Sequence, residues 1–418
     1  MGKLKDAVIG RLSKSKIKGV NDSAEFDVLY PTGFLSIDYL NGTIIHVDSD
    51  ERQFKYNAAG IVDGSTNTII GRSGSGKSTL LTQIVGEIIR KFIKEGMPTG
   101  LYFDDIEGSL PMSRKEFLLG LTKEELDEYA DFRNKGITTE NVYKRIKEIH
   151  REKTTNRKDY EYDTGLYDTY GQRIYKLVPT VYILDSLPML LPENLADDED
   201  LGGSMDASAI AKTNTMMFKK ISQLCKEANI IFFTINHILD QISMGFLPEA
   251  AQIAGLKQSE RLPGGKAALY LANNMFRVDD SKLLKKEKDG IDGSVVKLTI
   301  IKSRTNVSRR SVPLIFNKTE GMFDKELSLF YLLKEEGRIQ GAGAHSYLPG
   351  APDIKFNGKN FKSVLQSSPE LQRALAEECY KVLYPYLSET KNAKVRDNTT
   401  SDTIADIFNE LQELPDLT

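Results

Sequence analysis

Apolar residues in this chain fall into short continuous runs and into longer stretches with a helical repeat. The short runs are rich in β-branched and aromatic residues, which predicts buried strands at residues 66–70, 101–105, 181–185 and 230–235. After the first run, apolar residues at helical spacing predict a helix with one apolar face: Leu80, Leu81, Ile84, Val85, Ile88, Ile89 and Phe92. A second helix of this kind carries Ile210, Met217, Ile221, Leu224, Cys225 and Ala228 on one side. Strands that alternate with helices indicate an α/β fold with a mostly parallel, twisted sheet flanked by helices.

Weaker patterns complete the predicted core, which we place at residues 31–324. A turn-bounded segment from Pro31 leads through Ile44 and Ile45 toward the first core strand. Residues 113–150 are strongly polar and helical in pattern. Later strands are predicted to end at Val278 and to occupy residues 295–302 and 312–316.

An insertion is predicted within this core at about residues 120–176. Its second half, 151–176, interleaves tyrosines with basic residues: Tyr160, Tyr162, Tyr167, Tyr170 and Tyr175 among Arg151, Lys153, Arg157, Lys158, Arg173 and Lys176. Such a pattern suits the stacking of nucleic-acid bases. A surface hairpin with a small satellite core is the simpler interpretation, and we favour it.

The two ends of the chain differ in charge. Residues 1–30 form an N-terminal arm whose basic, amphipathic helix is either a loosely ordered terminus or a docking arm for a neighbouring subunit. Residues 325–387 are predicted to form a small α+β domain, in which Ser368 caps the last helix and Pro369 occupies its first turn. The remaining 388–418 form an acidic, flexible tail.

Composition sets limits on function. The chain has 418 residues and a net charge of −3, so any nucleic-acid site must be a local patch rather than a uniformly basic coat. Its two cysteines, Cys225 and Cys379, make no C-x-x-C pair, which suggests a reducing compartment and no structural zinc. No apolar run approaches the ~18 residues of a membrane helix, and the N-terminus lacks a signal-peptide core. We therefore expect a cytoplasmic protein without membrane contact.

One motif carries strong chemical information. Gly71-Arg-Ser-Gly-Ser-Gly-Lys77-Ser78 fits G-x-x-x-x-G-K-[ST], the P-loop pattern, in which backbone N–H groups cradle phosphates. The lysine reaches the β/γ-phosphate oxygens and the serine hydroxyl ligates Mg²⁺. The motif lies between a predicted strand and a predicted helix, the context it needs. We therefore expect ATP-type nucleotide and Mg²⁺ binding by Gly71, Arg72, Ser73, Gly74, Ser75, Gly76, Lys77, Ser78 and Thr79.

Polar residues at three other strand ends complete the predicted site, because α/β sheets bind ligands at the carboxyl ends of their strands. Glu107 follows the strand at 101–105 and is either a general base for phosphoryl transfer or a helix-capping glutamate. Asp185 ends the next strand and suits a Mg²⁺ ion held through water. Asn236 and His237 end another and suit a γ-phosphate sensor, although a lone histidine is more often structural.

Two further segments carry candidate binding residues. Residues 238–263 show little periodicity, and long irregular loops inside compact domains are usually functional or disordered. Residues 281–310 hold nine basic residues against three acidic ones. Within them, Lys302 and Arg304 lie at a strand end, where positive side chains could reach a phosphate across a subunit boundary.

The order of these motifs resembles that of the RecA recombinase family, particularly the UvsX-like recombinases of large phages, between about residues 30 and 387. Residues 71–78 match its Walker A motif, Asp185-Ser186 its Walker B motif, and Asn236-His237 its γ-phosphate sensor. Phe103-Asp-Asp-Ile-Glu107 matches the strand with the catalytic glutamate. Lys302-Ser-Arg304 resembles the pair of cations that reaches the neighbour's ATP.

The resemblance implies further roles. Residues 196–206 and 238–263 would be DNA loops, and residues 1–30 would be the docking arm. DNA-binding positions would be Lys212, Lys219, Phe246, Lys257, Gly264 and Gly265. Catalysis would involve Glu107, Lys77, His237, Lys302 and Arg304, with Ser78 and Asp185 on Mg²⁺. Two departures are His237, where bacterial RecA has glutamine, and Ser113, where RecA would place an aromatic adenine platform.

The expected function is that of a DNA-dependent ATPase that forms a head-to-tail filament on single-stranded DNA and pairs it with homologous duplex DNA. Its cofactors would be ATP and Mg²⁺, and single-strand-binding and loader proteins are expected partners. If the chain is phage-encoded, its location is the host cytoplasm. A hexameric helicase is one alternative, although about 30 residues before Pro31 are too few for a helical collar. A non-catalytic filament mediator that uses ATP as a clamp is the other.

Overall fold

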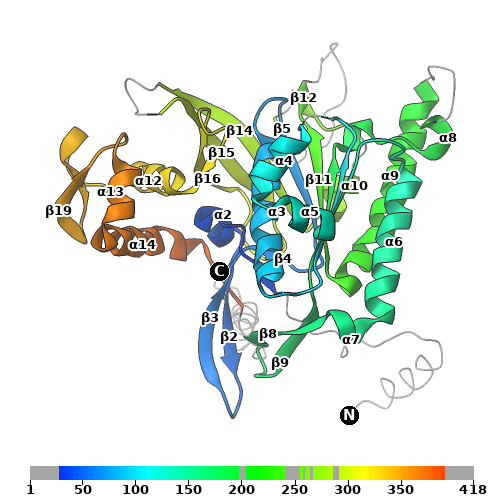
Figure 1. Ribbon diagram of the computed structural model, residues 1–418, viewed down its shortest axis with the longest axis horizontal. Helices are drawn as coiled ribbons and strands as arrows, with labels where there is room; N and C mark the ends of the chain where they lie inside the picture. The colour runs from blue at the N-terminus through cyan, green and yellow to red at the C-terminus, as the bar shows by residue number, and fades with distance from the viewer. Residues whose placement is uncertain are drawn as a thin grey trace, which may run out of the picture.

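A mostly parallel sheet forms the centre of the computed structural model, which describes residues 28–108, 110–196, 204–240, 255–257, 259–263, 267–285 and 291–390 (Figure 1). Among these residues the sheet has nine strands, in the order β17-β16-β15-β14-β5-β11-β10-β6-β7. The strands from β14 to β7 pair in parallel, and β15, β16 and β17 pair antiparallel at the other edge. Their bounds are β5 Thr66–Gly71, β6 Gly100–Asp105, β7 Ala130–Arg133, β10 Thr180–Asp185, β11 Ile230–His237, β14 Asn274–Leu284, β15 Gly293–Lys302, β16 Arg310–Asn317 and β17 Met322–Asp324. The predicted α/β class is confirmed.

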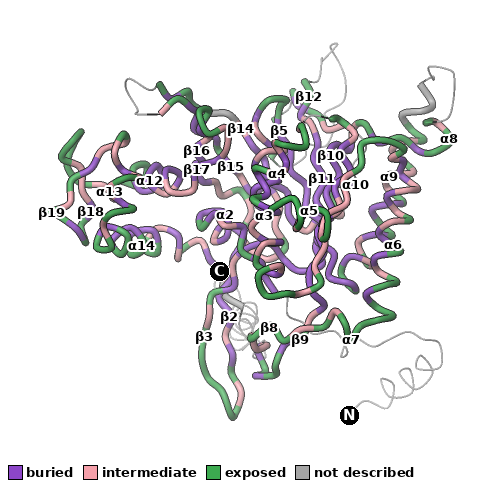
Figure 2. Tube along the Cα trace, in the orientation of Figure 1, coloured by how far each residue is buried: buried purple, intermediate pink, exposed green. Residues whose placement is uncertain are grey.

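Helices cover both faces of this sheet, since its central strands are apolar on both sides. In β10, Val181 and Ile183 belong to the same hydrophobic cluster as α3, whereas Tyr182 and Leu184 belong to the cluster that contains α6 and α9. Figure 2 shows the buried residues concentrated in these central strands and in α3. The helices are α3 Lys77–Lys94, α4 Met112–Leu119, α5 Lys123–Tyr129, α6 Thr139–Thr155, α7 Arg157–Tyr160, α8 Glu193–Ala196, α9 Ser204–Ala228 and α10 Ala267–Leu271.

The predicted strands and the two amphipathic helices are confirmed, although β14 continues to Leu284 instead of ending at Val278, and two sheet strands, β7 and β17, were not predicted. β7 pairs with β6 at the edge of the sheet, within residues 113–150, which the pattern predicts to be helical. Its residues are exposed or half-buried, so it lacks the apolar run that identifies the central strands. The insertion at 120–176 therefore contributes in part to the main sheet.

Two hairpins extend from the base of the sheet (Figure 1). The first, β2 Thr43–Asp48 with β3 Gln53–Ala58, lies in the segment predicted to lead through Ile44 and Ile45 toward the first core strand, and Ile45 is buried in the main cluster. The hairpin itself was not predicted. The second, β8 Glu161–Tyr167 with β9 Arg173–Leu177, is the predicted surface hairpin. It has no satellite core, because Ile174 is buried in the main cluster and Tyr162, Leu166 and Tyr167 pack against that cluster. The backbone N–H of Asp48 donates to Thr169 O (3.1 Å), which joins the two hairpins.

The C-terminal segment packs against the antiparallel edge of the sheet. It contains α12 Lys325–Glu335, β18 Ser346–Leu348, β19 Ala351–Phe356, α13 Phe361–Ser367, α14 Pro369–Leu383 and β20 Ser388–Thr390. The cap of the last helix is confirmed, because the Ser368 side chain accepts a hydrogen bond from the Leu371 N–H (3.1 Å). Shorter elements near the start of the chain are β1 Leu29–Tyr30, α2 Leu35–Leu40 and β4 Ile61–Val62, and β12 Leu239–Asp240 pairs with β13 Glu260–Arg261. β20 pairs with β2.

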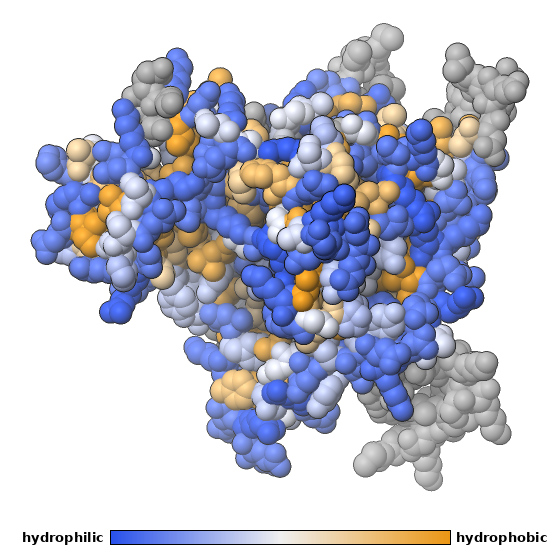
Figure 3. Space-filling view, viewed as in Figure 1, coloured by the Kyte–Doolittle hydropathy of each residue, from blue (hydrophilic) through white to orange (hydrophobic). Residues whose placement is uncertain are grey.

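Several predicted segments lie outside the described residues. These are the arm before residue 28, residues 197–203 and 241–254 of the two expected DNA loops, and the tail from residue 391. Within the described part of the chain, no helix combines the length and the apolar character needed to cross a membrane. Figure 3 shows a largely hydrophilic surface on the face in view, with hydrophobic residues in small separate groups.

A buried lysine joins α6 to the amino end of the central sheet. Lys153 is only 2% exposed, and its Nζ donates hydrogen bonds to Val178 O (2.6 Å), Thr180 Oγ1 (3.1 Å) and Asn229 O (3.4 Å). Burial lowers the pKa of Lys153 to about 7, because water can no longer solvate the ammonium group. In the unfolded chain the same group has a pKa of about 10.4.

This difference predicts a pH dependence of stability. Between about pH 7 and pH 10 the unfolded chain holds a proton that the folded chain has lost, so the free energy of unfolding rises with pH, by at most about 1.4 kcal/mol per pH unit. Lys153→Met should lack this slope, whereas Lys94→Met, at an exposed position of α3, should keep it. Urea unfolding at several pH values measures it. An equal slope in Lys153→Met and the unsubstituted protein would contradict the assignment.

Candidate functional site

The P-loop connects the end of β5 to the start of α3. Gly74 and Gly76 have φ angles of 77° and 84°, a left-handed conformation that favours glycine. At Gly71, a Cβ atom would lie 2.5 Å from the carbonyl oxygen of Val278 on β14, so that position also excludes a side chain. The glycines of the motif are therefore explained by the backbone path.

Parallel pairing brings the other predicted groups to the same edge of the sheet. His237 is in register with Gly71, and Asp185 with Asp105, and all four strands end at the same edge of the sheet, with β5 and β11 two residues longer than β6 and β10. Ser78 Oγ donates to Asp185 Oδ2 (2.7 Å), and His237 Nε2 lies 3.2 Å from Glu107 Oε2. The structure thus groups Ser78, Asp185, Glu107 and His237, all predicted site residues, around the P-loop.

Three acidic residues end β6 or follow it, and their partners distinguish them. Asp104 is buried on the α6 side, where Arg145 and Tyr182 donate hydrogen bonds to it. Asp105 is buried against Lys115 of α4, with 2.7 Å between Nζ and Oδ2. Glu107 remains partly exposed, with only His237 as a side-chain partner among the described residues. Of these three residues, only Glu107 is therefore placed to act on a bound ligand.

Asp185 has the features of a metal ligand. The residue is fully buried, and burial raises the pKa of its carboxyl group to about 6. Its Oδ1 atom has no hydrogen-bond partner among the described residues, and the same holds for Ser75 Oγ in the P-loop. A buried carboxylate oxygen without a partner is costly, and a hard cation such as Mg²⁺ satisfies it. The donor set of Ser78 and Asp185 therefore fits Mg²⁺.

Lys77 is folded back onto its own loop. Its Nζ donates to the carbonyl oxygen of Arg72 (2.8 Å), and burial lowers the pKa of its ammonium group. The charge of Lys77 thus lies within the loop that would receive the phosphates.

The P-loop also contacts residues that follow β11 in the chain. Arg72 forms a two-pronged ion pair with Asp240, with distances of 2.6 and 3.0 Å. Asn236 Nδ2 donates to Pro263 O (3.0 Å), near the far end of the predicted loop at 238–263. Of the described residues in the segment at 238–263, Asp240 thus contacts the P-loop, and Pro263 contacts the end of β11.

Lys302 and Arg304 lie away from the P-loop of their own chain. Lys302 pairs with Met275, three residues along β14 from Val278, which pairs with Gly71, so the two positions are about 10 Å apart along the strand direction. The Lys302 ammonium donates to Leu269 O (3.1 Å) and Tyr270 O (2.6 Å) at the end of α10. Arg304 is exposed. The structure does not bring these cations to the nucleotide site of the same subunit.

The expected DNA-binding residues are only partly described. Lys212 and Lys219 are exposed and lie two turns apart on α9, and Lys257 is exposed beside β13. Phe246, Gly264 and Gly265 lie outside the described residues.

Ser113, at the position where RecA would have an aromatic residue, lies near the start of α4. The Arg114 guanidinium lies 5.2 Å from the ring centroid of Phe117, an exposed residue one turn further on.

Three residues of this region were not predicted from the sequence. Lys115 neutralises Asp105, Arg145 pairs with Asp104, and Asp240 pairs with Arg72. None belongs to a motif. Each is identified only by the residue it meets, 10, 41 and 168 positions away in the chain.

Comparison with protein-family models gives no match for this chain, and comparison with curated proteins gives none either.

The buried, incompletely paired Asp185 predicts a gain in stability when it is neutralised. Its pKa of about 6 exceeds the ~3.9 of an unfolded aspartate, so the folded protein binds the extra proton between these values and loses stability as pH rises through them. Asp185→Asn should raise the free energy of unfolding of the nucleotide-free protein at neutral pH, by up to about 3 kcal/mol. The gain should shrink as pH falls toward about 4.

Urea unfolding at a series of pH values measures this effect. The matched control is Asp105→Asn, which should destabilise the protein because it leaves the buried Lys115 ammonium without its partner. If Asp185→Asn destabilises the protein as Asp105→Asn does, Asp185 is a structural residue rather than a metal ligand.

Proposed function

We propose that this protein is an ATP-dependent recombinase of the RecA type, which assembles on single-stranded DNA and pairs it with homologous duplex DNA. The observation that carries the proposal is the grouping of Ser78, Asp185, Glu107 and His237 around the P-loop. These groups supply what hydrolysis of a nucleoside triphosphate requires. The order of the motifs and the contacts between the P-loop and the segment at 238–263 support the recombinase among P-loop ATPases.

In this proposal, residues 71–79 hold the phosphates of ATP through backbone N–H groups and the Lys77 ammonium. Ser78 and Asp185 would hold Mg²⁺, which offsets the negative charge of the phosphate oxygens when it is bound. Asp185 is suited to this role because its unpartnered oxygen is buried at the end of β10.

Glu107 acts as the general base. It takes a proton from a water molecule whose oxygen attacks the γ-phosphorus, and the bond from that phosphorus to the ADP oxygen breaks. The products are ADP and inorganic phosphate, and the proton passes from Glu107 to solvent. His237, 3.2 Å from Glu107, positions the carboxylate.

Contacts at the same site would transmit the state of the nucleotide. His237 touches Glu107, and the neighbouring Asn236 donates to Pro263 at the end of the expected DNA loop. A γ-phosphate beside His237 would bias this strand end, and with it the loop, toward one arrangement. Order–disorder changes of this kind couple γ-phosphates to switch loops in other P-loop proteins.

Lys302 and Arg304 would act on the ATP of the adjacent subunit, since they are remote from their own P-loop. A head-to-tail contact that does not close into a ring generates a filament. Hydrolysis would therefore depend on assembly.

The decisive experiment is a joint-molecule assay with single-stranded DNA, homologous duplex DNA, ATP and Mg²⁺. We expect joint molecules, ATP hydrolysis stimulated by single-stranded DNA, and loss of at least about 100-fold of that hydrolysis in Glu107→Gln. Glu107→Gln should still bind ATP. Stimulated hydrolysis without joint molecules would overturn the recombinase in favour of a helicase, and the absence of both would favour a mediator.

Mixing of two variants tests action between subunits. Lys77→Ala lacks a working P-loop, and the double variant Lys302→Ala/Arg304→Ala lacks the cations, so each alone should be inactive. In an equimolar mixture about a quarter of the head-to-tail interfaces combine an intact P-loop with intact cations, so a corresponding share of DNA-stimulated hydrolysis should return. No recovery would show that the cations act within their own subunit.

A further inference from the structure

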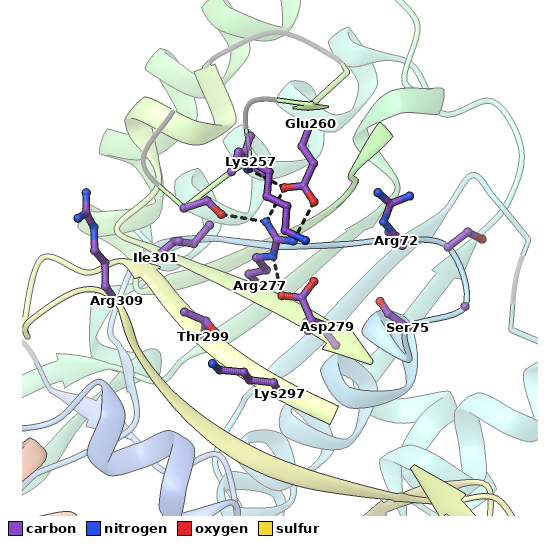
Figure 4. Close-up of a pocket in the computed structure, with 15 residues that line it drawn as sticks. Arg72, Ser75, Lys257, Glu260, Arg277, Asp279, Lys297, Thr299, Ile301 and Arg309 are labelled. Carbon is purple, nitrogen blue, oxygen red and sulfur yellow. Dashed lines mark hydrogen bonds and ion pairs between the residues drawn. The ribbon is translucent and has the colours of Figure 1, made fainter. Parts of the chain in front are cut away.

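A groove with several cationic side chains lies beside the P-loop and is not used in the proposed hydrolysis (Figure 4). It encloses about 790 Å³. Its floor is one face of β14 and β15, with side chains from alternate positions: Arg277, Asp279, Lys297, Thr299 and Ile301. Gly255, Leu256, Lys257 and Glu260 form one wall, and residues 72–75 of the P-loop line one end.

The carboxylates of this groove are already paired. Arg277, 7% exposed, donates to Glu260 through two nitrogens (2.7 and 2.9 Å), to Asp279 (2.6 Å) and to Gly255 O (2.9 Å). Figure 4 shows this network as the central feature of the groove. Four other cations line it. Arg72 is paired with Asp240, whereas Lys257, Lys297 and Arg309 are exposed, and none of these three is ion-paired with a carboxylate among the described residues. The groove therefore presents uncompensated positive charge.

Arg309 is held in an unusual backbone conformation. Its φ angle is 70°, in the left-handed region, where most residues with a side chain are strained. Its N–H donates to Ile300 O (2.6 Å), which holds the turn between β15 and β16 in this form. Glycine would satisfy the backbone at lower cost, so the arginine is explained better by its side chain than by the turn.

We propose that this groove binds the phosphodiester backbone of a single nucleic-acid strand through Lys257, Lys297 and Arg309. The identity of the polymer rests on the proposed function, whereas the chemistry, a chain of phosphates, rests on the groove itself. Lys297 is three strand residues from Ile300, which Arg309 touches, so the two cations are about 10 Å apart along β15.

That span matches a short run of phosphates in one strand, which advance about 3.4 Å per nucleotide when stacked. The described residues that line the groove include no aromatic side chain, so they offer bases no stacking surface. Binding would read the backbone and not the sequence.

The test measures the salt dependence of oligothymidine binding, with a non-hydrolysable ATP analogue and Mg²⁺, for the unsubstituted protein and for Lys297→Ala/Arg309→Gly. Each lost phosphate contact removes about 0.7 from the slope of log K against log salt for single strands, so the double variant should have a slope smaller by about 1.4. Glycine also relieves the left-handed φ at position 309, so the variant should fold. The matched control, Lys55→Ala/Lys123→Ala, removes two exposed charges from β3 and α5, outside the groove, and should leave the slope unchanged.

An unchanged slope in Lys297→Ala/Arg309→Gly would overturn the inference. If the slope is unchanged but self-assembly in the absence of DNA is altered, the groove is instead an interface with a second copy of the chain. If the unsubstituted protein binds no oligothymidine, the proposed function fails, and inorganic tripolyphosphate becomes the probe. Binding of tripolyphosphate that is lost in the groove variant would then support the phosphate groove alone, and equal binding by both proteins would overturn it.

Discussion

The parallel register of β5, β11, β10 and β6 is the constraint on which the candidate site depends. It aligns Gly71 with His237 and Asp105 with Asp185, so groups from four separate parts of the chain meet at one edge. The hydrogen bond from Ser78 to Asp185 then fixes the start of α3 against the centre of the sheet. A slip of one residue in any of these strands would turn its final side chain to the opposite face of the sheet. The apolar residues on both faces of β10 and β11 oppose such a slip, because it would exchange the two hydrophobic clusters.

Three carboxylates are buried at the same edge of the sheet, and burying a charged group lowers the stability of the fold. Asp104, Asp105 and Asp185 are all buried, but among the described residues only the first two form an ion pair with a cation. Leaving one buried carboxylate without a full set of partners lowers the stability of the nucleotide-free fold. Among the described residues, the buried Asp38 has no ion-pair partner either, but it accepts two hydrogen bonds from Thr32, whereas one oxygen of Asp185 has no partner. The contrast with Asp104 and Asp105 within one small region supports a ligand-binding role for Asp185 more strongly than its burial alone does.

The sequence predicted those features that depend on neighbours in the chain. The P-loop glycines, the apolar strands, the two amphipathic helices and the Ser368 cap all follow from local backbone geometry or periodicity. The hairpin of β2 with β3 was not predicted, because most residues of β3 are exposed. β7 was not predicted, because it is short, exposed or half-buried, and stabilised by pairing with β6, a distant part of the chain. Lys115, Arg145 and Asp240 were missed for the same reason, since each acquires its role only through a partner brought close by the fold.

The two described ends of the segment at 238–263 are held with unequal strength. At one end, Arg72 and Asp240 are both largely exposed, and ion pairs of that kind contribute about 0–1 kcal/mol. At the other, Arg277 and Glu260 are buried and share several hydrogen bonds, so removing either partner would leave a buried charge unpaired, at a cost of about 3–5 kcal/mol. Any rearrangement that begins at the P-loop will therefore break the Arg72 contact long before it breaks the Arg277 contact. In the proposed function, the end of the segment beside the P-loop is therefore the one that would respond to a bound nucleotide, and the end beside the cationic groove would stay in place.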